Sequence, residues 1–167
     1  YIQELVIHSK EKKIDRIAAG KDHLLGTNSF PNFNEVILEQ LVQEPKTESL
    51  EPLLTPIRPF RIASRFEEVR LETEKSGRRP TVFLFKYGNP AWATARSAFS
   101  GNFFACAGYE ILDPPAFLSV DAEIEAFKKA DPDLIVLCSA DETYTSMAPA
   151  VIESMGKRPI LVVAGYP

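Results

Sequence analysis

Residues 79–90 read Arg-Pro-Thr-Val-Phe-Leu-Phe-Lys-Tyr-Gly-Asn-Pro, an apolar run followed by a loop and by a proline that can open a helix. Similar units recur about every 25 residues, as expected when each strand is followed by a crossover helix. Three of the apolar runs are continuous, which is typical of a parallel sheet covered on both faces. We therefore predict an α/β fold, a doubly wound parallel sheet with strand order 2-1-3-4. The predicted strands are Thr81–Phe85, Tyr109–Leu112, Leu134–Cys138 and Pro159–Val163.

Three helices are predicted between these strands, beginning near Ala91, Val120 and Glu142. Ser119 stands where it can cap the second helix, and Pro149 requires either a late start or a kink in the third. The apolar residues of each helix fall on one face at helical spacing. These are Trp92, Ala95, Phe99, Asn102/Phe103 and Cys106 in the first helix, Val120, Ile124 and Phe127 in the second, and Tyr144, Met147, Val151 and Met155 in the third.

The composition indicates one ordinary core with an appendage. The 167 residues are 45% hydrophobic and 10% aromatic, and 19 basic residues against 23 acidic ones give a net charge of −4. No long run of one sign indicates a nucleic-acid surface, so we expect proteins or small molecules as partners. The two cysteines, Cys106 and Cys138, have neither metal-binding nor disulfide spacing, and we expect both in the core.

Residues 1–57 differ from the rest of the chain. Apolar residues at patchy helical spacing run up to Gly20, and five prolines interrupt the stretch that follows. Such a segment buries little of itself, so it is either a linker or the edge of a neighbouring domain. The chain also opens at Tyr1 rather than methionine, which indicates a segment of something longer. The prolines are Pro31, Pro45, Pro52, Pro56 and Pro59.

Residues 58–79 predict a single helix that connects the two parts of the chain. The apolar spacing places it over Pro59–Ser76, and Gly77 ends it. The charged residues lie mostly away from the face that we expect to pack. That face consists of Ile62, Phe66, Val69 and Thr73.

Ligands of parallel sheets bind beyond the carboxyl ends of the strands, which here are residues 86–90, 113–118, 139–141 and 164–167. The first of these loops has Gly88 alone, not the glycine cluster that lets backbone amides approach a pyrophosphate. It also lacks an acidic pair for magnesium and a hydroxyl-rich phosphate loop. A nucleotide, magnesium or flavin site is therefore disfavoured at this edge.

Several stretches of the chain resemble one known family, in the same order along the sequence. Residues 26–32 (Gly-Thr-Asn-Ser-Phe-Pro-Asn), preceded by Arg16-Ile17-Ala18 and Lys21-Asp22, are similar to the end of the catalytic barrel in methylmalonyl-CoA mutases. Residues 60–70 look like that family's last barrel-associated helix, and residues 95–110 resemble its small subunit in particular. The resemblance covers nearly the whole chain.

This resemblance implies a fold and a division into domains. Residues 80–167 would form a flavodoxin-like (Rossmann-like) sheet of the cobalamin-binding-domain type, without its last strand and helix. Residues 1–57 would be the tail of the acyl-CoA (TIM-barrel) domain with a linker, and residues 58–79 the connecting helix. The family's holoenzyme uses adenosylcobalamin to interconvert methylmalonyl-CoA and succinyl-CoA, and its small subunit pairs with a large subunit.

The resemblance also locates the residues that would bind the cofactor. Cobalamin-binding members carry Asp-x-His-x-x-Gly after the first strand, and the histidine ligates cobalt. These positions correspond to Ala91, Ala93 and Arg96, and none of them matches. The two histidines, His8 and His23, lie far upstream, where a surface or core role is the simpler interpretation.

Three residues remain as vestiges of the cofactor pocket. Gly88 follows the first strand, Ser139 matches a serine directed toward the cofactor's nucleotide tail, and Gly165 matches a small residue that makes room for it. The alternative is that Ser139 only caps a helix and Gly165 only turns the chain. In that case Trp92 or Tyr166 would fill the pocket.

We therefore expect a non-catalytic small-subunit segment, cytoplasmic, without metal or bound adenosylcobalamin, whose degenerate cobalamin-type domain pairs with the large subunit. One alternative is a functional cobalamin-binding module that lacks a histidine ligand, and another is a free-standing flavin or nucleotide binder. The unpaired edge of a shortened sheet also predicts self-association of the chain.

Overall fold

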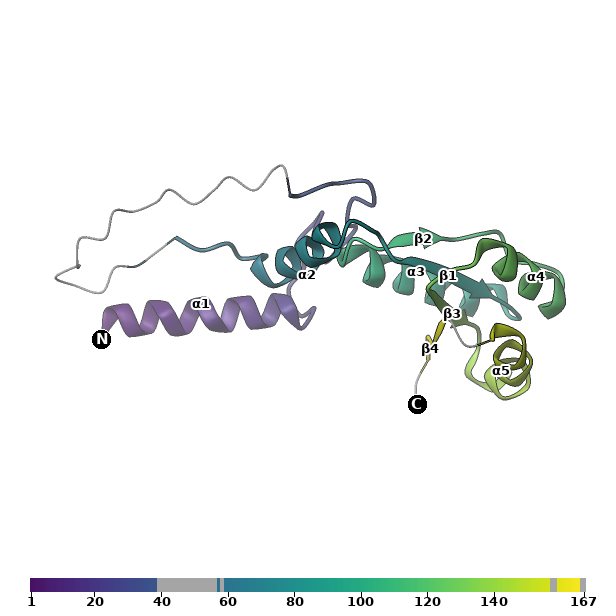
Figure 1. Ribbon diagram of the computed structural model, residues 1–167. Helices are drawn as coiled ribbons and strands as arrows, with labels where there is room; N and C mark the ends of the chain where they lie inside the picture. The colour runs from purple at the N-terminus through teal and green to yellow at the C-terminus, as the bar shows by residue number, and fades with distance from the viewer. Residues whose placement is uncertain (39–56, 58, 157–158, 166–167) are drawn as a thin grey trace.

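A computed structural model describes residues 1–38, 57, 59–156 and 159–165. Figure 1 shows an elongated molecule with α1 (Ile2–Ala18) at one end and an α/β lobe at the other, joined by α2 (Ser64–Lys75). Pro45, Pro52, Pro56 and Tyr166 lie outside the described residues, so the expectations that rest on them are not addressed by the structure.

The lobe contains one four-stranded parallel sheet in the order β2-β1-β3-β4, which confirms the predicted fold class and strand order. The strands are β1 (Thr81–Lys86), β2 (Glu110–Leu112), β3 (Leu134–Cys138) and β4 (Ile160–Val163), each within one residue of the predicted bounds. β1 and β3 are the central strands, and their apolar runs are buried on both faces.

Two apolar layers cover the two faces of the sheet. On one face, Phe83 and Phe85 pack with helices α4 (Val120–Ala130) and α5 (Asp141–Met155). On the other, Val82 and Leu84 alternate with them and meet residues from the α3 (Pro90–Cys106) side. This alternation along one strand follows from the two-residue period of β structure. Cys106 and Cys138 are buried, as predicted, and burial raises the pKa of the Cys138 thiol to about 12.

The helices begin close to the predicted residues. The Ser119 side chain accepts a hydrogen bond from Ala122 N–H, which confirms it as the cap of α4. Asn89 caps α3 in the same way, ahead of Pro90. Because α5 starts at Asp141 and contains Pro149, the alternative of a late start was wrong.

The apolar stripe predicted for α3 does not face the sheet. The helix packs on the sheet through small residues, Ala93, Ser97, Ser100, Gly101 and Ala105, while Trp92, Phe99 and Phe103 point outward and are 52%, 70% and 61% exposed. A methyl group added at Gly101 would already touch Leu84 and Ile111 at 3.5 and 3.6 Å. Small side chains let α3 approach the sheet closely, and the sequence period alone does not reveal which stripe does so.

α2 also differs from its prediction. It begins at Ser64 rather than Pro59. Thr73 of the predicted face is buried, as expected, but Val69 of that face is 53% exposed, and Arg70 is buried. The Arg70 guanidinium donates to the backbone oxygens of Asn32 and Glu35 at 2.8 and 2.7 Å. Arg70 of α2 therefore holds the chain segment that leads to residue 38. The apolar pattern had instead predicted a packing contact by Val69.

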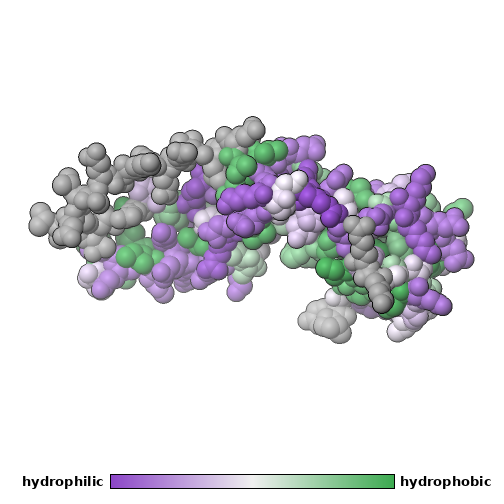
Figure 2. Space-filling view, in the orientation of Figure 1, coloured by the Kyte–Doolittle hydropathy of each residue, from purple (hydrophilic) through white to green (hydrophobic). Residues whose placement is uncertain are grey.

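The molecular surface is unevenly apolar. In Figure 2, hydrophobic residues gather over α1 and around β4, and hydrophilic residues cover much of the rest of this view. β4 is an edge strand of the sheet, and its Ile160 and Val163 are 63% and 47% exposed. In the part of the chain that the structure describes, no helix has the length and apolar character needed to cross a membrane.

One carboxylic acid is buried at the end of β1. Glu123 of α4 is fully inaccessible, and its Oε1 accepts a hydrogen bond from the Lys86 backbone N–H. Its Oε2 has no hydrogen-bond partner among the described residues. Burial raises the pKa of Glu123 to about 8, against the smaller opposing effects of the Lys86 amide and charge.

This burial predicts a stability that falls as pH rises. Between pH 4.5, the ordinary pKa of the group, and about 8, the unfolded chain releases the Glu123 proton while the folded chain keeps it. Glu123→Gln should therefore raise the free energy of unfolding at pH 8 by on the order of 4 kcal/mol and have little effect near pH 4.5. Urea unfolding across this range tests the prediction, with Glu125→Gln, exposed on the same helix, as the control. Parallel pH profiles for wild type and Glu123→Gln would contradict it.

Candidate functional site

The carboxyl ends of the four strands meet at one edge of the sheet, and the three residues predicted to be vestiges of a pocket lie there together. Gly88 has φ +81°, and a methyl group added to it would sit 3.1 Å from Ser139 Oγ. Ser139 is fully buried. A methyl group on Gly165 would lie 2.7 Å from Asp141 and 3.0 Å from Tyr144, too close for a real side chain. The edge is therefore crowded at all three positions.

Ser139 joins strand ends and does not cap a helix. Its hydroxyl donates to the Tyr87 backbone oxygen at 2.6 Å, which ties the loop after β1 to the end of β3. The residue before α5 is Ala140, and it makes no side-chain cap. The capping alternative for Ser139 was therefore wrong.

Arg96 is the central side chain of this edge, reaching across it from α3. One terminal nitrogen donates to the Ser139 backbone oxygen and to Tyr144 Oη, the latter at 3.0 Å. The other pairs with the Asp141 carboxylate at 2.8 Å. The guanidinium also lies over two rings, with its carbon 5.1 Å from the Trp92 centroid and 5.5 Å from that of Tyr144. Burial lowers the pKa of Arg96, but the bonds to Tyr144 and Asp141 outweigh it, so the pKa is raised and Arg96 stays charged.

Tyr144 completes the arrangement from α5. Its hydroxyl accepts the Ser139 N–H at 2.9 Å and lies 2.6 Å from the Ala164 oxygen and 3.1 Å from the Leu137 oxygen, to which it can donate. It thus serves backbone groups at the ends of both β3 and β4. We call the side chains of Arg96, Asp141 and Tyr144 the edge cluster.

The edge cluster was not predicted from the sequence. Tyr144 was assigned to the apolar stripe of its helix, and Arg96 was noted only where the resemblance places a glycine. One feature of the sequence could have indicated the role of Arg96: it is the only charged residue among the seventeen residues of α3. At the position that corresponds to the ligand histidine, Ala93 is buried on the sheet side of α3. Trp92 does not fill the edge; it is half exposed and stacks against Arg96.

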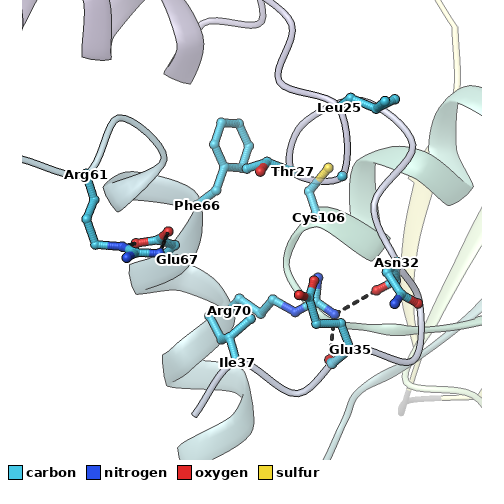
Figure 3. Close-up of a pocket in the computed structure, with 11 residues that line it drawn as sticks. Leu25, Thr27, Asn32, Glu35, Ile37, Arg61, Phe66, Glu67, Arg70 and Cys106 are labelled. Carbon is cyan, nitrogen blue, oxygen red and sulfur yellow. Dashed lines mark hydrogen bonds and ion pairs between the residues drawn. The ribbon is translucent and has the colours of Figure 1, made fainter. Parts of the chain in front are cut away.

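A hollow of about 450 Å³ lies between the N-terminal segment and the α2 and α3 helices (Figure 3). Among its charged side chains, Arg61 pairs with Glu67 at 2.6 Å, and Arg70 donates to the backbone oxygens of Asn32 and Glu35. Nearby, the Glu74 carboxylate accepts the Ile37 and Leu38 amides. These contacts hold the N-terminal segment against α2. We therefore interpret the hollow as a gap left where these two parts of the chain pack together.

Curated proteins similar to this chain include two methylmalonyl-CoA mutase small subunits. A methylmalonyl-CoA mutase small subunit from Porphyromonas gingivalis is 42% identical over 168 aligned positions, covering 99% of this chain and 27% of that protein. The chain is a relative of the methylmalonyl-CoA mutase small subunits. A small subunit from Streptomyces virginiae is 28% identical over 84% of the chain and 22% of the relative.

These relatives confirm the resemblance to the mutase small subunits. The chain spans about a quarter of the length of the curated relatives that it matches. No protein-family model matches it. The parallel sheet agrees with the flavodoxin-like, cobalamin-binding type of fold that the resemblance implied. Among the described residues, no three or more His, Cys, Asp or Glu side chains gather as a metal site would require.

The edge cluster predicts a specific loss of stability. Tyr144→Phe removes the hydroxyl that serves the buried Ser139 N–H and the backbone oxygens of β3 and β4, so the free energy of unfolding should fall by about 1–3 kcal/mol. The matched control is Tyr109→Phe, because the Tyr109 ring stacks on Phe104 outside the cluster. Urea unfolding of both variants measures the difference. Equal stability of the two would mean that the Tyr144 hydroxyl is not needed at this edge.

Proposed function

We propose that this chain is a non-catalytic part of the small subunit of adenosylcobalamin-dependent methylmalonyl-CoA mutase, in the cytoplasm, and that its cobalamin-type domain is degenerate. Its function is to pair with and stabilise the large subunit, which carries the interconversion of methylmalonyl-CoA and succinyl-CoA. In this proposal residues 1–57 are the tail of the barrel domain and residues 58–79 the connecting helix. The chain itself binds no adenosylcobalamin.

The observation that carries the proposal is the edge cluster. The crevice beyond the strand ends is where a doubly wound sheet holds its ligand. Here the Arg96 guanidinium and the Tyr144 ring occupy the positions next to Ser139 and Gly165, and their polar atoms bond to one another and to the strand ends. A cofactor tail would have to displace a charged group that already has an ion pair, two hydrogen bonds and two aromatic contacts.

The loop after β1 supports the same conclusion. It supplies no imidazole, and the position that corresponds to the ligand histidine holds Ala93. The N-terminus of α3 is closed as well, because Asn89 caps Ala91 N–H and Pro90 has no amide hydrogen to offer a phosphate. The residues present therefore do not fit cobalamin, and they favour a flavin or nucleotide no better.

The proposal predicts that the purified chain is colourless and does not bind cobalamin. Titration with adenosylcobalamin, and separately with hydroxocobalamin, should leave the absorption spectrum of the cofactor unchanged at micromolar concentrations. A cobalamin protein with a histidine ligand is the positive control. Micromolar binding with a spectrum that changes in His8→Ala or His23→Ala would favour the module that binds cobalamin without the usual histidine.

The proposal also predicts a stable complex with the large subunit. Co-purified small and large subunits should migrate as one species in size-exclusion chromatography, and the small subunit alone should show no mutase activity. The large subunit should melt at a lower temperature without its partner, because a partner that binds only the folded state stabilises it. Independent migration of the two chains would contradict the proposed function.

A further inference from the structure

β2 stops short of the end of β1. Its pairing with β1 runs from Thr81 to Phe83, whereas β1 continues to Lys86. At Lys86 the backbone N–H donates to Oε1 of Glu123 on α4, in place of a residue of β2. The Glu123 carboxyl therefore serves the strand end that β2 leaves without a partner, and it does so from a fully buried position.

The side chain of Lys86 ties the same strand end to the residues that follow β2. Its Nζ lies 2.7 Å from Asp113 Oδ1, and the two side chains are 14% and 52% exposed. Residues 113–119 belong to no helix or strand, so this ion pair is one of the contacts that hold them against β1. They lie beyond the carboxyl end of β2, at the edge where sheets of this type bind ligands.

Glu123 is a second carboxyl group within reach of the Lys86 ammonium. Its Oε2 has no hydrogen-bond partner among the described residues, and its Oε1 already contacts the backbone amide of the lysine itself. The flexible four-carbon stem of a lysine lets its ammonium turn toward groups close to its own main chain. One cation therefore stands between two carboxyl groups, a buried one and a half-exposed one.

The protonation state of Glu123 decides which carboxyl group holds Lys86. Burial raises the pKa of Glu123 to about 8, so near neutral pH the group is uncharged and Asp113 keeps the ammonium. Once Glu123 is ionised, it is a buried carboxylate without a partner, which is costly. Breaking an ion pair whose aspartate is half exposed costs little by comparison. The ionised Glu123 should therefore take the ammonium from Asp113.

The elements packed against α4 bring no second cation to Glu123 among the described residues. α4 packs on β1 and α5, and Lys86 is the charged residue of β1. Cys138 of β3 interacts with Glu123, but burial raises the pKa of its thiol to about 12, so it stays neutral. Tyr87 and Tyr144 border the same apolar layer as phenols. The other charged residues of α4 and α5 are exposed: Asp121, Glu125, Lys128, Lys129, Asp141, Glu142 and Glu153.

We propose that Lys86, Asp113 and Glu123 form a proton-controlled switch, in which Lys86 holds Asp113 while Glu123 is protonated and pairs with Glu123 once it is ionised. The proton leaves to solvent, and Lys86 keeps its charge in both states. In the second state residues 113–119 lose their ion pair with β1 and gain mobility at the ligand edge of the sheet. The switch does not depend on pairing with the large subunit, so it goes beyond the proposed function.

The mobility of a spin label on the complete small subunit tests the release of residues 113–119. The label is attached at Leu118→Cys, since Leu118 is fully exposed, and a label at Ile152→Cys on α5 is the reference. The label at 118 should become more mobile as pH rises, with a midpoint near 8, and the reference should not. Glu123→Gln keeps an oxygen for the Lys86 amide without a charge, so it should abolish the change. Glu125→Gln, exposed on the same helix, should respond like wild type.

A double-mutant cycle tests whether Lys86 is the shared group. The infrared band of the protonated carboxyl, assigned by its loss in Glu123→Gln, gives the pH at which Glu123 ionises. Asp113→Asn should lower this pH by about one unit, because Lys86 is then free to pair with the Glu123 carboxylate. Lys86→Met should raise it, because the cation is gone. In the Lys86→Met background, Asp113→Asn should have no further effect.

The expected set of results supports the switch, and three others overturn it. If the mobility of the label at 118 is independent of pH, residues 113–119 are not released. If the response persists in Glu123→Gln, another group drives it. If Asp113→Asn acts as strongly in the Lys86→Met background, the two carboxylates repel each other directly and Lys86 is not exchanged. None of these results bears on the proposed function, because the large subunit takes no part in the experiments.

Discussion

Where the four parallel strands end, backbone N–H and C=O groups are left that the helices do not hydrogen-bond. The structure depends on the side chains that form hydrogen bonds with these groups. Tyr144 bonds to the ends of β3 and β4, Ser139 links β3 to the loop after β1, and Arg96 adds a charge that Asp141 balances. In a ligand-binding sheet this edge is left open for the ligand. Here the protein's own side chains satisfy it, which is the physical basis for proposing a structural rather than a catalytic domain.

α3 connects this edge to the outside of the molecule. Its small residues bring it close to the sheet, so that Arg96 can reach the strand ends, and the same orientation turns Trp92 and the two phenylalanines outward. Trp92 belongs to both regions, because the Arg96 guanidinium lies over its ring. The placement of Arg96 at the strand ends and the exposure of aromatic side chains on α3 are therefore linked consequences of one helix orientation.

The N-terminal segment is held by a different kind of contact. Irregular backbone must find hydrogen-bond partners, and the Arg70–Glu74 pair of α2 supplies them for Asn32, Glu35, Ile37 and Leu38. The interaction joins groups more than thirty residues apart in the sequence. This clamp also positions the loop that presents Phe30 beside α3.

The sequence by itself determined the strands, their parallel order, the starts of the three helices between them and the Ser119 cap, because continuous apolar runs, turn residues and caps are local signals. It also carried the relationship to the mutase small subunits. Only the tertiary structure decided which side of α3 packs on the sheet. The hydrophobic periodicity of the sequence points to the large aromatic side chains, whereas close contact between helix and sheet requires small ones. It likewise assembled Arg96, Asp141 and Tyr144, which come from two helices and meet only because the strand ends bring those helices together.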